Sequence, residues 1–317
     1  MRRMIIWVAA ILGLLVLLSF VGGYYLTELA LRPRFERDAE RCYENFAENY
    51  PTLQSWGDSL RQAQNLTLEH LTAEDGTPLT AYRIMADKPT HRTAVVVHGY
   101  TDHPFGMLQI AWIYHRMGYN ILLPTLRYHG ESGGDSIGMG WNDRLDVKAW
   151  IDQLPTLFGA EQQVVVHGIS MGAATTMMLA GEADLTPAVR CFVEDCGYMG
   201  VWEQFQKELK EDYHLPPFPI LHTANLICRW RFGWDFLEAS SLEAVRRCER
   251  PMLFIHGSED RYVPTWMVYP LYYEKGGAKE DKEKWIAPDS RHAVSFADHP
   301  EEYIQHVKAF VGRYISE

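Results

Sequence analysis

The chain has 317 residues, of which 47% are hydrophobic and 22% are charged, and its formal net charge is −11. These values are typical of a globular chain with one large domain. The acidic excess repels a nucleic-acid backbone, so we expect no nucleic-acid partner.

The first 31 residues predict a transmembrane anchor. The run from Met4 to Val21 is apolar and the first charge after Arg3 is Glu28, so its length is about the 20 residues that a helix needs to cross a bilayer. A cleaved signal sequence and a buried core helix are the alternatives, but the run is long, terminal and without a clear A-x-A cleavage pattern. We expect a retained single-pass membrane anchor that places the following domain outside the cytoplasm.

Residues 32–58 are charged and aromatic and predict a connector, and residues 59–317 predict one α/β domain. Two amphipathic segments, 66–71 and 79–84, flank a turn sequence and indicate a hairpin. The strand-like apolar runs that follow are mostly continuous, which is typical of strands buried on both faces. Helical patterns lie between and after them, so we expect a mostly parallel eight-stranded sheet flanked by helices. The runs are 93–97, 119–123, 164–166, 192–193, 252–255 and 285–287.

Residues 197–249 form a long aromatic-rich departure between two of the predicted sheet strands. Loops that follow the carboxyl ends of such strands build the binding pocket in open α/β sheets. We interpret the segment as a cap-like insertion that faces the substrate. The alternative is a set of helices packed on the sheet edge, because aromatic residues dominate protein cores in general.

A G-x-S-x-G motif stands between a predicted strand and a predicted helix, with Ser170 at its centre and Gly168 and Gly172 around it. Strand, motif and helix in this order predict a nucleophile elbow, in which the serine occupies a tight, strained turn. The glycines allow strand and helix to pass closely. The turn also directs the Met171 backbone N–H and the positive end of the helix at the group that Ser170 attacks.

A serine nucleophile needs a base, and the base needs an orienting carboxylate. Asp260 follows the run 252–255 and His292 follows the run 285–287, so both are expected at the same sheet edge as Ser170. Glu259 and Asp195 are rival acids. His299 and His306 are rival bases, but they belong to the start and the interior of the last helix, so we predict the triad Ser170, Asp260 and His292.

The motifs 98–100, 127–132, 167–172 and 256–260, followed by His292, resemble the α/β-hydrolase superfamily. They are most similar to its bacterial membrane-anchored serine esterases and prolyl-oligopeptidase-like hydrolases. The resemblance covers about residue 66 to the end of the chain. It implies the same triad, an oxyanion hole formed by the backbone N–H groups of Tyr100 and Met171, and neither a metal nor an organic cofactor. Tyr128 and His129 depart from the usual Arg-Gly-His sequence.

The leading hypothesis is a serine hydrolase that cleaves a carboxylic ester, or a thioester or amide, through an acyl-enzyme. A prolyl-oligopeptidase-like peptidase and a catalytically silent binding scaffold are the alternatives. We expect a small or lipid-like acyl substrate and a membrane partner; the pattern does not predict an oligomeric state. We also expect a form without residues 1–31 to fold and to act on short soluble esters.

Overall fold

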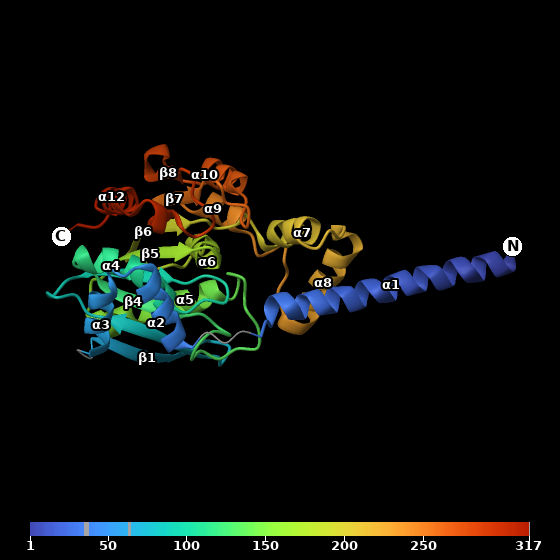
Figure 1. Ribbon diagram of the computed structural model, residues 1–317, viewed down its shortest axis with the longest axis horizontal. Helices are drawn as coiled ribbons and strands as arrows, with labels where there is room; N and C mark the ends of the chain where they lie inside the picture. The colour runs from blue at the N-terminus through green and yellow to red at the C-terminus, as the bar shows by residue number, and fades with distance from the viewer. Residues whose placement is uncertain (35–37, 63–64, 317) are drawn as a thin grey trace.

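The computed structural model describes residues 1–34, 38–62 and 65–316. A rounded body contains the sheet, and one long N-terminal helix extends from it (Figure 1). The sheet has eight strands in the order β1-β2-β4-β3-β5-β6-β7-β8, antiparallel at the β1-β2 and β2-β4 pairs and parallel elsewhere, which confirms the predicted architecture. The strands are β1 (Leu66–Thr72), β2 (Pro78–Ile84), β3 (Arg92–Val97), β4 (Asn120–Thr125), β5 (Gln163–Ile169), β6 (Val189–Asp195), β7 (Met252–Gly257) and β8 (Lys282–Ala287).

The central strands are buried on both faces, as their continuous apolar sequences require. Val95 and Val96 of β3 point to opposite sides of the sheet, and neither has measurable exposure. The edge strand β1 is partly exposed along its whole length. Gly76, with φ of 85°, supplies the left-handed residue of the turn that joins β1 to β2.

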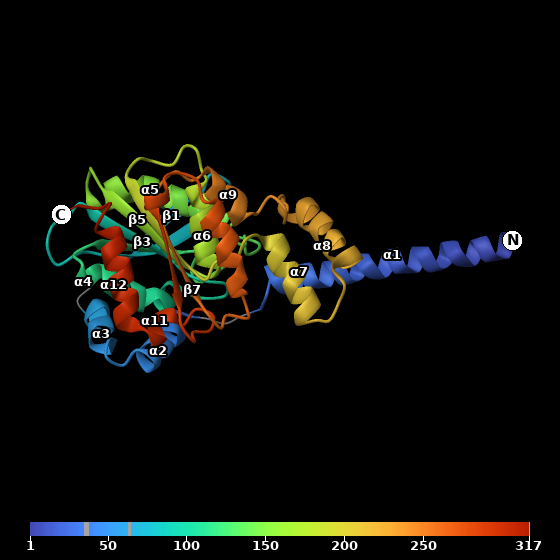
Figure 2. The same ribbon diagram turned by 90° about the horizontal axis from the view of Figure 1, so that it is seen from above.

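Two helical layers cover the sheet (Figure 2). Each layer packs against its own hydrophobic core, so both faces of the sheet are shielded from water. One layer contains α5 (Asp143–Phe158), α6 (Met171–Ala180), α9 (Ser241–Arg247) and α10 (Val268–Glu274). The other contains α2 (Ala39–Asn49), α3 (Gln54–Gln62), α4 (Leu108–Arg116), α11 (Ser295–Asp298) and α12 (Pro300–Val311).

Residues 39–58 of the predicted connector, 32–58, are part of this second layer, whereas its residues 35–37 lie outside the described residues. Tyr43 and Phe46 of α2 and Leu60 of α3 are buried in the core that α4 and α12 share. The predicted boundary between residues 58 and 59 falls inside α3. The segment forms a short amphipathic helix pair that helps to cover one face of the sheet.

Arg127 anchors the loop that follows β4. Its guanidinium donates to both carboxylate oxygens of Asp146 on α5, at 2.7 and 2.6 Å, and to Asp75 in the β1-β2 turn at 3.1 Å. A bidentate pair of this kind fixes orientation as well as charge. Arg127 therefore ties the sheet edge to α5.

The predicted insertion, 197–249, divides into two parts. Its first two helices, α7 (Val201–Glu211) and α8 (Pro217–Phe232), lie outside the body beside α1 (Arg2–Leu31), whereas α9 packs on α6 (Figures 1 and 2). Within the described residues, α1 is the helix long and apolar enough to cross a membrane. Its last turns contact α8 and the body, so it is a candidate span that is joined to the cap.

Candidate active site

Ser170 stands at the turn between β5 and α6 in a strained conformation, with φ of 57° and ψ of −118°. The flanking glycines explain how the turn is possible. A Cβ on Gly168 would lie 2.0 Å from the Gly172 carbonyl oxygen, and a Cβ on Gly172 would lie 2.1 Å from the Val97 carbonyl oxygen. Larger residues at these positions would force β5, α6 and β3 apart.

Ser170, His292 and Asp260 form one hydrogen-bonded row. His292 Nε2 lies 2.8 Å from Ser170 Oγ, and His292 Nδ1 lies 2.7 Å from Asp260 Oδ2. Asp260 comes from the loop after β7 and His292 from the loop after β8, as their positions in the sequence predicted. An ionised carboxylate only accepts hydrogen bonds, so Nδ1 carries the proton and Nε2 is left to accept from the serine hydroxyl.

The carboxylate of Asp260 is held in its charged form. Burial disfavours the charge, but hydrogen bonds from His256 and His292 outweigh that effect and lower the pKa of Asp260 to about 2. Its second oxygen accepts from the backbone N–H groups of Tyr262 and Val263, each at 2.9 Å. The geometry therefore favours a permanently ionised partner for His292.

The rival residues are engaged elsewhere. Glu259 is exposed, and Asp195 accepts a hydrogen bond from Tyr303 at 3.0 Å. Burial raises the pKa of Asp195 to about 6, so its carboxyl group keeps a proton to higher pH than that of Asp260 does. His299 Nε2 lies 2.7 Å from the Pro288 carbonyl oxygen, and His306 stacks on Trp285.

His256 is a site residue whose role the sequence did not reveal. It is fully buried at the end of β7, where its Nε2–H donates to the Val263 carbonyl at 2.9 Å and lies 3.3 Å from Asp260 Oδ2. It therefore supports the acid at the same carboxylate oxygen that His292 contacts. Its place four residues before the predicted acid was the available signal.

The loop after β3 lies beside the elbow. A Cβ on Gly99 would be 3.6 Å from Ser170 Cβ, and Tyr100 and Met171 border the same cavity as Ser170. His98 Nε2 accepts from the Leu126 backbone N–H at 3.0 Å, which holds this loop against the end of β4. Tyr100 and Met171, whose N–H groups we expect to form the oxyanion hole, therefore both border the cavity that contains Ser170.

Residues 94–306 match the model of the Alpha/beta hydrolase family. This chain belongs to that family. It is 29% identical over 236 residues to the Bacillus subtilis protein called Uncharacterized protein YqkD, covering 74% of this chain and 76% of the relative. It is 23% identical over 257 residues to the Saccharomyces cerevisiae Uncharacterized membrane protein YNL320W, covering 80% and 83%. The Pyrococcus furiosus esterase Pf2001 has the same fold, with a TM-score of 0.66 and 23% identity over 81% of this chain and 96% of that one.

The hydrolase contains a cavity of about 410 Å³ that reaches Ser170. Its walls are mostly apolar side chains and tyrosine rings from the cap and the body, with carboxyl groups of α7 at one side. Burial raises the pKa of one of these carboxyls, Glu208, above its ordinary value. The cavity suits a ligand with a substantial apolar part.

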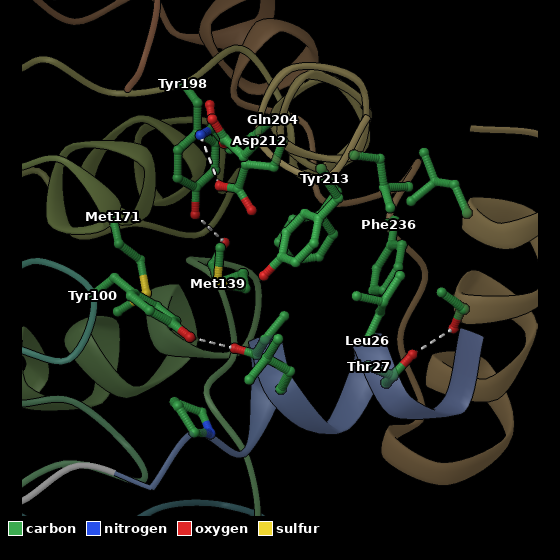
Figure 3. A pocket seen from close by; sticks show the side chains of 18 of the residues that line it. Leu26, Thr27, Tyr100, Met139, Met171, Tyr198, Gln204, Asp212, Tyr213 and Phe236 are labelled. Atoms are coloured by element: carbon green, nitrogen blue, oxygen red, sulfur yellow. Dashed lines mark hydrogen bonds between the residues drawn. The ribbon is translucent and has the colours of Figure 1, made fainter. Parts of the chain in front are cut away.

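One wall of this cavity is the C-terminal end of α1. Leu26 and Thr27 line the cavity on the side that faces Tyr213 and Phe236 (Figure 3). Ala30 lies next to Tyr100. The alpha/beta hydrolase thus builds part of its cavity from the helix that the sequence assigned to the membrane alone. A form without residues 1–31 lacks this wall, and the expectation that it folds and acts on short soluble esters stays a prediction.

Proposed function

We propose that this alpha/beta hydrolase is a serine hydrolase that cleaves carboxylic esters through an acyl-enzyme on Ser170. His292 acts as general base and then general acid, Asp260 orients and stabilises the imidazolium, and the Tyr100 and Met171 N–H groups bind the oxyanion. The observation that supports the proposal is the hydrogen-bonded row from Ser170 Oγ through His292 to Asp260.

The proposed reaction has two halves. Ser170 Oγ attacks the ester carbonyl while its proton passes to His292 Nε2, and the tetrahedral oxyanion collapses as the imidazolium protonates the departing alcohol. Water then gives a proton to Nε2 and attacks the acyl-serine, and the acid leaves with Ser170 Oγ restored as a hydroxyl. Neither half requires a metal or an organic cofactor.

We propose an acyl ester with a lipid-like chain as the substrate class. The apolar cavity beside Ser170 and the esterase name of the Pyrococcus furiosus neighbour support this choice. A chain-length series of nitrophenyl esters, run beside matched thioesters and aminoacyl anilides, tests it. Longer acyl esters should give the higher kcat/KM, and faster turnover of the anilides would favour a peptidase instead.

A fluorophosphonate probe tests the nucleophile directly. The full chain should be labelled, and Ser170→Ala should not be. Ser55→Ala, which changes an exposed serine of α3, is the matched control and should label as the wild type does. Labelling of Ser170→Ala to the same extent as the wild type would overturn the proposed mechanism.

We also propose that α1 holds the enzyme in a membrane with the body outside the cytoplasm. The length and apolar sequence of α1, the two arginines at its start and the membrane-protein name of the yeast relative support the anchor. Reporter fusions to the C-terminus, one active only outside the cytoplasm and one only inside, test the orientation.

A further inference from the structure

The part of α1 that packs in the structure has the reverse of the usual pattern for a helix in water. Its buried residues are Ser19, Gly23, Thr27 and Leu31, three of which are small or polar. The large apolar side chains point outward, such as Leu17, which is 59% exposed. Helices that associate in lipid show this arrangement, because apolar side chains face the acyl chains and small residues let the backbones approach.

The contact of α1 with α8 uses those small residues. Ser19 Oγ and Thr223 Oγ1 share a hydrogen bond of 3.0 Å, and Thr27 Oγ1 lies 3.4 Å from the Ala224 carbonyl oxygen. The backbone of Gly23 sits so close that a Cβ would be 2.5 Å from Thr223 Oγ1. Thr223 and Ala224 therefore pack on the small-residue stripe of α1, on the side of α8 that also buries Leu221, Ile227 and Cys228.

The outward face of α8 is exposed and carries large apolar side chains, with His222 and Arg229 beside them. Leu226 is 53% exposed and Trp230 is 84% exposed. With Phe20, Val21 and Tyr24 of α1, they border an almost wholly apolar groove of about 460 Å³. Water disfavours a continuous apolar surface across two helices, so this surface marks an interaction site.

Charged groups mark where the apolar surface ends. Glu28, the first charged residue of α1 after Arg3, forms ion pairs with Arg231 at the end of α8 and with Arg32. The groove lies on the N-terminal side of this charged cluster, toward the candidate span. Phe20 and Trp230 are therefore on the membrane side of the boundary.

We propose that the outward face of α8 lies in the interfacial layer of the bilayer that α1 crosses, against lipid headgroups and the first carbons of the acyl chains. Residues 4–21 of α1 extend about 27 Å at 1.5 Å per residue, close to the roughly 30 Å of a hydrocarbon core. This length places Tyr24 and Trp230 at the depth where aromatic belts form. Since α8 crosses α1 (Figure 1), it lies along the surface when α1 spans the membrane.

Bromolipid quenching of tryptophan fluorescence tests this position of α8 in the bilayer without any measurement of catalysis. A failure of this proposal is therefore distinguishable from a failure of the proposed reaction. The full chain is placed in phosphatidylcholine vesicles whose acyl chains carry bromine near the headgroup or near the chain end. Quenching by the shallow bromines should fall in Trp230→Phe relative to the wild type. Quenching by the deep bromines should change little.

Trp112→Phe is the matched control, because Trp112 belongs to α4 on the side of the body away from α1 (Figure 1). It should leave the lipid-dependent quenching unchanged. Equal quenching in Trp230→Phe and the wild type overturns the proposal, because α8 then faces water or protein. The proposal is also overturned if Trp230 is shielded from water only in nanodiscs that hold two copies of the chain. A second copy, and not lipid, then covers this face.

Discussion

The Tyr100 hydroxyl donates a hydrogen bond to the Ala30 carbonyl oxygen across 2.8 Å. Tyr100 belongs to the loop whose backbone N–H we assign to the oxyanion hole, and Ala30 lies in the last turn of α1. The candidate membrane helix is thereby connected to the reaction centre through one side chain.

Tyr100→Phe should lower kcat on a short soluble ester about fivefold and leave KM nearly unchanged. A hydrogen bond of this kind contributes about 1 kcal/mol, and the ring remains to fill the same space. Steady-state kinetics measure the effect, and a thermal melt shows whether the fold is intact. An unchanged kcat with an intact fold would mean that α1 does not position this loop.

Gly23→Ala should lower both stability and activity, whereas Gly22→Ala should change neither appreciably. The new methyl group at residue 23 would overlap Thr223 and the Ala224 backbone, but a Cβ at residue 22 meets nothing within 4 Å. Overpacking of this kind costs about 1–3 kcal/mol. Thermal unfolding and ester turnover of the two variants, both in the same detergent, make the comparison, and equal behaviour would contradict the tight α1-α8 contact.

Ser170→Ala, His292→Ala and the double variant should lose activity to a similar extent, on the order of 10⁵-fold, because a nucleophile and its base act as a unit. Turnover of a nitrophenyl ester by the three proteins measures this. Losses that multiply in the double variant would show that the two residues act in separate steps.

Asp260→Asn should reduce kcat by about 10⁴-fold, since an amide neither stabilises the imidazolium nor enforces the tautomer that Ser170 needs. Glu259→Gln is the control and should stay near the wild-type rate, because Glu259 is exposed. The proposed acid is wrong if the control is the damaging change.

Asp143 should make the protein less stable as the pH rises from about 4 to 7. Burial and the neighbouring Asp146 raise the pKa of Asp143 to about 7, so in this window the folded chain holds a proton that the unfolded chain has lost. Asp143→Asn should remove the contribution of Asp143 to this pH dependence, roughly 2 to 4 kcal/mol of unfolding free energy across the window. The amide oxygen of the new side chain still accepts from the Gly140 N–H. Urea unfolding at pH 5 and pH 8 tests it, with the exposed Asp135→Asn as a control that keeps the slope.

The residues of the proposed triad were predictable because each follows a strand whose apolar sequence is visible by itself. Ser170, Asp260 and His292 occupy loops after β5, β7 and β8, and parallel strands bring such loops to one edge. The sheet was predictable for the same reason. Its order still required the structure, because the apolar sequence of a strand does not identify its neighbours.

The role of α1 in the cavity was not predictable from hydrophobicity, which shows that a helix suits lipid but not which turn packs on protein. Ser19, Gly23 and Thr27 recur every four residues within the apolar helix and were the available signal. The predicted connector packs on the body through α2 and α3, most of whose residues are polar; the side chains that they bury in the core include Cys42, Tyr43, Phe46 and Leu60.

The shared wall between α1 and the cavity has a consequence for proteolysis. A protease that cuts α1 inside the bilayer near residue 21 would release a body that still carries Leu26, Thr27 and Ala30, but with the Ser19 contact to α8 lost. A cut after Leu31 would remove the wall itself. The position of the cut, rather than release from the membrane itself, would therefore decide whether the released body keeps this wall of the cavity.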